Sequence, residues 1–155
     1  MVRYLLGGPN KVKDSMALQS IAYTSQAKAD ITQADVDRIV NDAAAHNRMS
    51  GVTGFLLFDG ALFLQCVEGP EDGVALAYSR ILNSRSHHEI VELGRGLCGA
   101  RRFPQWPMYC AVVDAADLRK CYRADWSGLS RSRNSSPVMP TGLDLMLEFV
   151  TPHLF

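Results

Sequence analysis

The feature that most constrains this chain is the stretch 51–70, GVTGFLLFDGALFLQCVEGP, in which Asp59-Gly60 separates two apolar runs. An Asp-Gly pair between two apolar runs is a strong signal for a β-hairpin. The second run, 61–67, is apolar at successive positions rather than at alternate ones, as in a strand that is covered on both faces. We therefore expect a central pair of strands over 52–58 and 61–67.

Gln65 lies in the middle of the second apolar run. A buried amide without hydrogen-bond partners costs about 1–3 kcal/mol. Neighbouring groups must therefore meet both its oxygen and its NH2 group. This predicts a polar site beside the centre of the sheet.

Two helices are predicted around the hairpin. Thr32 fits an N-cap with Asp35 three residues later, and an apolar stripe at helical spacing follows, so we expect the first helix to end near His46 or Asn47. Pro70 fits the first position of a second helix that ends near Asn83.

Three further strands are predicted over 17–23, 89–93 and 108–113. The fold class that follows is α+β, a ferredoxin-like β-α-β-β-α-β core with an extra strand and with both helices on one sheet face.

The chain divides into three predicted parts: an N-terminal extension over 1–16, the α+β domain over 17–113, and a C-terminal helical extension over 114–155. In the last part, 114–125 has a weak helical pattern, 127–140 is polar, and 141–155 contains an apolar-periodic segment. Such a short apolar helix needs a surface to lie on. The sequence leaves open whether this surface is its own sheet, another subunit or a downstream partner.

Composition narrows the functional classes. The 155 residues carry a formal net charge of zero, so no overall field favours nucleic acid or an acidic membrane. No apolar run is long enough to span a membrane, and the N-terminus does not fit a secretory signal, so we expect a cytoplasmic protein. The four cysteines form no CxxC pair, and no metal site is expected.

Tyr23, Asn47 and Gln65 are predicted to face the cleft between the two helices. A phenol and two amides are poor general bases at neutral pH but bind carbonyl and NH edges well, as a flat aromatic ligand presents. Tyr23 and Asn47 also have simpler interpretations: a lone Tyr most often packs with its hydroxyl in water, and an Asn at a helix end is most often a C-cap. Gln65 is the exception, because its apolar neighbours do not suit a solvated glutamine. Further along the chain, Trp106 and Met108 would more often belong to a core.

Four short segments form one ordered pattern along the chain. They are Tyr23-Thr24-Ser25-Gln26-Ala27, His46-Asn47 followed by Val52-Thr53-Gly54-Phe55-Leu56, Phe63-Leu64-Gln65-Cys66-Val67-Glu68-Gly69-Pro70, and Phe103-Pro104-Gln105-Trp106-Pro107-Met108. In this order and at these separations, they resemble the BLUF family of flavin-based blue-light sensors over about residues 17–113.

The resemblance implies a photoreceptor rather than an enzyme, with FAD, or alternatively FMN or riboflavin, between the two helices. Asn47 would hold the pyrimidine edge, and Gln65 would bridge Tyr23 and the flavin. Light would draw an electron and a proton from Tyr23, the Gln65 amide would rearrange, and Met108 and Trp106 would pass the change to the C-terminal segment. The implied cofactor-binding set is Tyr23, Ser25, His46, Asn47, Gln65, Arg80, Arg85 and His87. The implied partners are a homo-oligomer and an unidentified downstream protein, with no nucleic acid and no membrane.

The chain departs from the family after the second helix, where an Asp-x-Arg-His motif is usual. The aligned residues are Ser84, Arg85, Ser86 and His87. Arg80 still matches the family pattern and would bind the C2 carbonyl edge or the ribityl-phosphate side of the flavin. Arg85 would replace the missing basic residue.

Two other hypotheses remain open. The first is a small hydrolase of acylphosphatase type that aims Arg80 and Asn47 at a phosphate, although the expected glycine-rich phosphate loop is missing. The second is a binding or dimerisation module that keeps the fold and does not respond to light.

Overall fold

The computed structural model describes residues 18–102, 106–130 and 141–150, so the predicted N-terminal extension lies outside the described residues. Within them, one sheet contains five strands in the order β4-β1-β3-β2-β5. The strands are β1 (Leu18–Ala27), β2 (Thr53–Phe58), β3 (Leu62–Pro70), β4 (His87–Cys98) and β5 (Tyr109–Val112). The helices are α2 (Gln33–Ser50), α3 (Glu71–Asn83), α4 (Ala115–Tyr122) and α5 (Gly142–Val150), with a short 3₁₀ helix, η1, over Ser127–Ser130.

The topology confirms the expected ferredoxin-like core with one added strand. Strand β1 pairs antiparallel with both β3 and β4, and β2 pairs antiparallel with β3. Strand β5 is the addition and runs parallel to β2 at the sheet edge. The register places Tyr23 of β1 directly opposite Gln65 of β3.

The hairpin forms as expected, but its turn lies one residue further along the chain. Asp59 N donates to Leu62 O at 3.3 Å, which makes Gly60 and Ala61 the central turn residues. Gly60 has φ +102°, a conformation that costs little only for glycine. The Asp59 carboxylate fixes the turn because it accepts from the backbone N–H groups of Ala61 at 2.9 Å and Leu62 at 2.7 Å. Asp59 therefore anchors the turn from its first position.

Helix α2 begins as expected and ends later. The Thr32 hydroxyl accepts from Asp35 N, and the Asp35 carboxylate accepts from Thr32 N. The helix continues to Ser50, three residues beyond Asn47, because Gly51 adopts the left-handed conformation that closes it. Asn47 is therefore not the C-cap. Pro70 is the N-cap of α3 rather than its first helical residue.

Two strands are longer than their sequence patterns indicate. Strand β1 runs to Ala27 rather than ending at Tyr23, and β4 covers His87–Cys98 rather than 89–93. The two strands pair with each other from Leu18↔Cys98 to Ala27↔His87, with two register shifts. Their added length therefore comes from mutual pairing, which a local pattern does not reveal.

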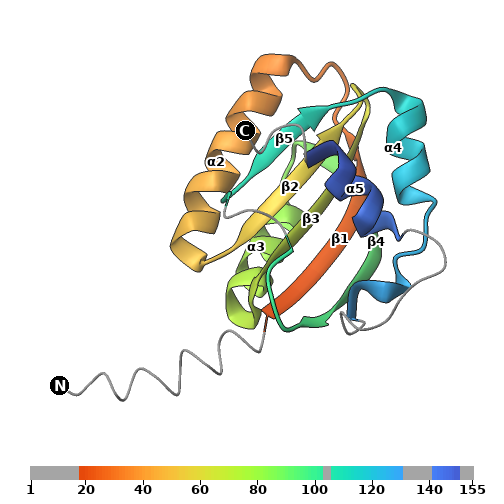
Figure 1. Cartoon of the computed structure of the whole chain (residues 1–155). Coiled ribbons are helices and arrows are strands. Elements are labelled where there is room, and N and C mark those ends of the chain that lie inside the picture. Colours follow the sequence, from red (N-terminus) through yellow and green to blue (C-terminus); the bar gives the residue numbers. More distant parts are fainter. Residues whose placement is uncertain (1–17, 103–105, 131–140, 151–155) are drawn as a thin grey trace.

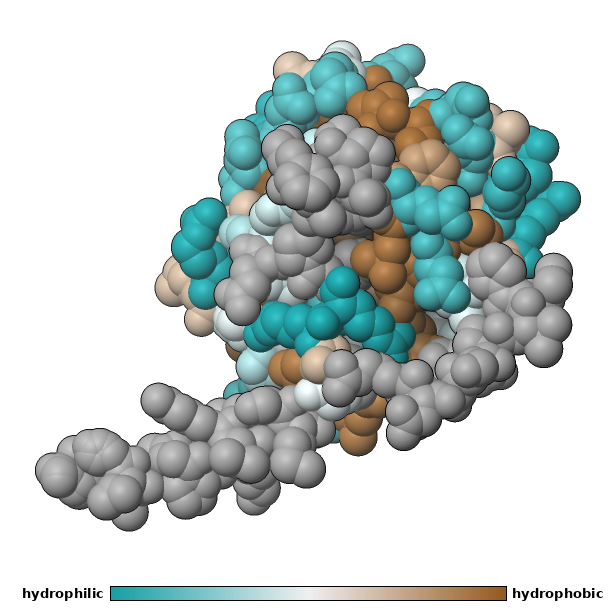
Figure 2. All heavy atoms as spheres, in the orientation of Figure 1, coloured by the Kyte–Doolittle hydropathy of each residue, from teal (hydrophilic) through white to brown (hydrophobic). Residues whose placement is uncertain are grey.

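The sheet is covered on both faces (Figure 1). Helices α2 and α3 pack on one face around Val36, Leu56 and Val74. Elements α4, η1 and α5 pack on the other around Leu118, Leu129 and Met146. Of the three surfaces considered for the tail helix, the structure shows its own sheet. Figure 2 views this second face, where hydrophobic residues remain visible between hydrophilic ones.

The central strands send alternate residues to the two faces. Along β3, Phe63, Gln65 and Val67 face the α2/α3 side, whereas Leu64 and Cys66 enter the core beneath α4 and α5. This explains why the segment 61–67 is apolar at successive positions. Among the described residues, no helix combines the length and the apolar character that crossing a membrane requires.

Candidate functional site

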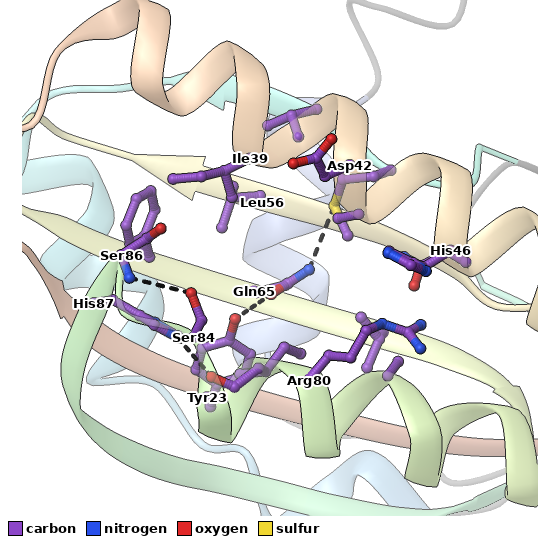
Figure 3. A pocket seen from close by; sticks show the side chains of 18 residues that line it. Tyr23, Ile39, Asp42, His46, Leu56, Gln65, Arg80, Ser84, Ser86 and His87 are labelled. Atoms are coloured by element: carbon purple, nitrogen blue, oxygen red, sulfur yellow. Dashed lines mark hydrogen bonds between the residues drawn. The ribbon is translucent and has the colours of Figure 1, made fainter.

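A cavity of about 220 Å³ lies between α2, α3 and the central strands (Figure 3). Half of its lining side chains are apolar and supply most of its surface, and its polar groups gather around Gln65 and along the two helices. The lining residues are Tyr23, Ile39, Val40, Asp42, Ala43, His46, Asn47, Leu56, Phe63, Gln65, Val67, Ala77, Arg80, Ile81, Ser84, Ser86, His87 and Met108. An apolar cavity with a few converging polar groups is the usual form of a small-molecule site.

The Gln65 amide is only 6% exposed and has a partner at each end. The Tyr23 hydroxyl donates to its Oε1, and its Nε2 donates to Met108 Sδ at 3.4 Å. A thioether sulfur has no hydrogen to donate, so the NH2 group must face Met108 and the oxygen must face the phenol. Turning the amide over would leave its oxygen against sulfur without a hydrogen bond. The present orientation is therefore the favoured one among these three residues.

Tyr23 is buried, with 3% of its surface exposed. Burial, and to a smaller degree the nearby Tyr78, raises the pKa of the Tyr23 phenol far above its ordinary value. The two rings meet edge to face with centroids 6.0 Å apart. Tyr23 therefore stays protonated at any physiological pH and acts as a hydrogen-bond donor to Gln65.

Asn47 is brought to the cavity from the last turn of α2 and is 4% exposed. Its Nδ2 donates to Pro107 O at 2.8 Å, which ties the segment before β5 to the helix. Among the described residues no donor meets its Oδ1. The amide is thus fixed in position with an acceptor available to a ligand.

His87 and Ser25 form a second polar group beside Tyr23. His87 Nε2 lies 2.8 Å from Ile81 O, and its Nδ1 lies 2.6 Å from Ser25 Oγ. Burial lowers the pKa of His87, so the ring is neutral near pH 7. Because a carbonyl only accepts, Nε2 carries the proton and Nδ1 accepts from Ser25. The ring packs edge to face on Tyr23 at 6.0 Å.

Arg80 and His46 approach the same end of the cavity from opposite helices (Figure 3). Arg80 Nη2 is buried and has no hydrogen-bond partner among the described residues. A buried guanidinium N–H without a partner is costly. It therefore marks a place where a ligand acceptor would fit.

The remaining predicted site residues are placed differently. Arg85 is exposed and is not among the residues that line the cavity. Ser25 is buried behind His87 and reaches the cavity only through that ring. Trp106 lies on the other sheet face, where its ring contacts Tyr109 at 4.6 Å and Phe55 at 6.5 Å between centroids. Met108, not Trp106, is therefore the neighbour of Gln65.

Some lining residues are not apparent from the sequence pattern. The apolar stripe of the first predicted helix indicates packing, yet Ile39, Val40 and Ala43 of this stripe line the cavity. Asp42 also lines it, and a signal for this is its spacing: it lies one helical turn before His46, which places both side chains on the same helix face. Ser84 and Ser86 also line the cavity, at the positions where the sequence departs from the family pattern.

The donor set fits a flavin. The apolar lining suits a flat ring system, and the Arg80 Nη2 and Asn47 Oδ1 atoms supply a donor and an acceptor for carbonyl and NH edges. Within the described part of the chain, no group of three or more His, Cys, Asp or Glu side chains could hold a metal ion.

Comparisons with known proteins also indicate a flavin-binding family. The sequence model of the BLUF family, described as sensors of blue light using FAD, matches residues 18–109. The chain is 33% identical over 132 residues to a blue light- and temperature-regulated antirepressor of Escherichia coli K12, a match covering 85% of this chain and 32% of the relative. It is 28% identical over 115 residues to a photoactivated adenylate cyclase subunit beta of Euglena longa, covering 74% of this chain and 13% of the relative.

Solved structures agree. The dark-state structure of BlrB, a BLUF protein, matches with a TM-score of 0.63 and 29% identity, covering 70% of this chain and 84% of that chain. Klebsiella pneumoniae BlrP1 with FMN and cyclic diGMP matches with a TM-score of 0.56 and 35% identity, covering 63% of this chain and 26% of that chain. The chain thus spans about a third or less of the length of the two curated relatives. With the family model covering most of the sheet and both cavity helices, this chain belongs to the BLUF family of flavin-based blue-light sensors.

Proposed function

We propose that this chain is a blue-light photoreceptor that holds FAD, or alternatively FMN or riboflavin, in the cavity between α2 and α3. The observation that carries the proposal is the buried Gln65 amide, with the Tyr23 hydroxyl at one end and Met108 at the other, on the wall of the cavity. A flavin bound there supplies the absorption of blue light and, once excited, an acceptor for one electron and one proton.

Tyr23 is the donor in this proposal. Its phenol gives up one electron and one proton and later regains both, so the cycle involves no net oxidation. Because Tyr23 donates its hydrogen bond to Gln65 Oε1, loss of the phenolic proton removes one of the two hydrogen bonds that hold the amide in its present orientation. The amide rearranges, by rotation or tautomerisation, and presents a different hydrogen-bond pattern to the ring edge beside it.

Each hydrogen bond that changes is worth on the order of 1 kcal/mol, which biases an equilibrium several-fold. Met108 Sδ accepts a hydrogen bond from Gln65 Nε2, so this bond breaks when the amide rearranges. Met108 immediately precedes β5, and the carbonyl of Pro107 is bound by Asn47. We therefore place the output on the β5 edge and on the extension 114–155, with the unit 17–113 as the sensor.

The relatives indicate that one sensor serves different outputs, since one is named an antirepressor and another a cyclase subunit. We propose that this chain signals through α4, α5 or a homo-oligomer contact to a separate downstream protein in the cytoplasm, without nucleic acid or a membrane. We propose no turnover, because neither the protonated Tyr23 phenol nor the amides of Asn47 and Gln65 act as a general base. The acylphosphatase alternative is disfavoured, since none of the cavity-lining residues is a glycine that could belong to a phosphate loop.

The test is an absorption spectrum of the purified protein after addition of FAD, recorded in the dark and after blue light. The expected result is a bound flavin with a small, reversible red shift. A protein that stays colourless after reconstitution contradicts the proposal. A bound flavin without a reversible shift would instead favour the binding module that does not respond to light.

A further inference from the structure

Asp42 is a charged cavity residue to which the photochemistry assigns no part. It lies on α2, lines the cavity and is exposed to solvent (Figure 3). None of the three salt bridges among the described residues involves it, and no described side chain donates a hydrogen bond to its carboxylate. A carboxylate that lines a ligand cavity without a partner of its own is available to the ligand.

The charges around the cavity limit what Asp42 can accept. Among the lining residues, Arg80 is the only Lys or Arg and Asp42 the only Asp or Glu, so their formal charges cancel. The Nη2 atom of the Arg80 guanidinium is buried and has no hydrogen-bond partner among the described residues. Ser84 and Ser86 add hydroxyl groups and no charge. The lining therefore offers a phosphate only one cation, and that cation lies opposite a carboxylate.

A carboxylate accepts hydrogen bonds from hydroxyl groups and repels phosphate. A flavin carries both kinds of group on one arm, since the ribityl chain has hydroxyls along its length and, in FMN and FAD, a phosphate at its end. The apolar residues Ile39, Val40 and Ala43 on the same helix suit the ring system. The solvent-exposed carboxylate of Asp42, one helical turn before His46, suits the polyol that leaves the ring.

Resting on the proposed function, we propose that Asp42 is a specificity residue, which accepts hydrogen bonds from the ribityl hydroxyls and disfavours a phosphate at the end of that arm. Riboflavin and FMN differ only by this phosphate, which carries a charge of about −1.5 to −2 at pH 7. The ratio of their dissociation constants therefore measures the electrostatic effect, and the shared ring and ribityl chain cancel.

The experiment compares the wild-type protein with Asp42→Asn and a matched control, Asp37→Asn. Asp37 is on the same helix and exposed, but it does not line the cavity. Dissociation constants for riboflavin and FMN are measured by quenching of flavin fluorescence at about 10 mM salt, where the Debye length is about 30 Å. In Asp42→Asn we expect the ratio of the FMN constant to the riboflavin constant to fall about three-fold or more.

The same ratio should stay within experimental error in Asp37→Asn, and in the wild type it should fall when the salt is raised to about 0.5 M. An unchanged ratio in Asp42→Asn, or an equal fall in Asp37→Asn, overturns the inference while leaving flavin binding intact. If no variant binds either flavin, the proposed function fails first and this inference fails with it.

A second substitution tests the hydroxyl contact. Asp42→Ala removes the acceptor, so riboflavin should bind about five-fold more weakly, as expected for the loss of one hydrogen bond. Lumiflavin, which has the ring and no polyol, should bind equally well to both proteins. Equal losses for riboflavin and lumiflavin would contradict the contact, because they would indicate a general disturbance of α2.

Discussion

The two faces of the sheet are built for different purposes from the same strands. On one face, β3 presents Phe63, Gln65 and Val67 to a cavity of about 220 Å³ beneath α2 and α3. On the other face, Leu64 and Cys66 of the same strand meet a closed core with Leu118, Trp126 and Met146. The first face holds hydrogen-bonded polar groups beside open space, and the second fills its space with side chains. The difference separates the face that bears the proposed flavin site from the face that packs against α4, η1 and α5.

The closed face is held by specific contacts. Trp126 Nε1 donates to Cys121 O at 3.0 Å, and a side chain at Gly142 would run into the Trp126 ring, so the last helix lies close against it.

The two faces meet at the segment before β5. There Arg102 N donates to the buried Glu68 carboxylate at 2.8 Å, and Arg102 Nη2 donates to Leu129 O of η1 at 2.9 Å.

The largest expected contrast comes from truncating one residue on each face. Leu118→Ala opens a void in a closed core and should lower the free energy of unfolding by about 2–5 kcal/mol. Ile39→Ala enlarges an existing cavity and should lower it by less than about 1.5 kcal/mol in the flavin-free protein. Urea denaturation measures both values. Equal losses would show that the cavity face is packed like the other and would remove the distinction.

A smaller effect is expected where the faces meet. Arg102→Ala removes the bond to Leu129 O and should cost about 1 kcal/mol. Hydrogen exchange should become faster over 118–129, while exchange around Tyr23 and Gln65 stays as it was. Arg101→Ala is the matched control from the same loop: Arg101 binds Gly51 O and Thr53 Oγ1, so faster exchange should appear near 51–53 instead. Identical patterns from the two variants would refute separate anchoring.

The smallest expected effect is a pH dependence on the cavity face. The pKa of His87 in the folded chain lies below its ordinary value of 6.5 because the ring is buried. Its contribution to stability is therefore present above pH 6.5 and is lost as the pH falls through the lowered pKa. His87→Gln, which keeps a side-chain donor and acceptor, should lose less stability than the wild type between pH 7.5 and pH 5. Parallel urea midpoints for the two proteins would contradict this assignment.

Local patterns predicted the elements that local physics determines. The hairpin followed from its apolar runs and turn residues, and α2 from the capping pair of Thr32 and Asp35. The lengths of β1 and β4 did not follow, because they depend on pairing between distant segments. The fold class was correct because the order of elements limits a sheet of this size to few topologies.

The candidate site likewise contains features that the sequence predicts and features that it does not. The register that places Tyr23 opposite Gln65 makes their predicted meeting a property of the backbone. The choice of Met108 rather than Trp106 beside the amide and the exposure of Arg85 depend on which way side chains turn. Spacing alone does not determine these, since neighbouring residues in the 106–108 segment reach opposite faces of the sheet.

The measurement that tests the account most directly is a light-minus-dark absorption spectrum of Gln65→Leu beside the wild type, each loaded with FAD. Leucine keeps the apolar volume and removes both ends of the amide, so the variant should bind flavin and lose the light-induced red shift. The wild-type spectrum, recorded under the same illumination, should show the shift and its decay in the dark. A shift of unchanged size in Gln65→Leu would contradict the central role assigned to this amide.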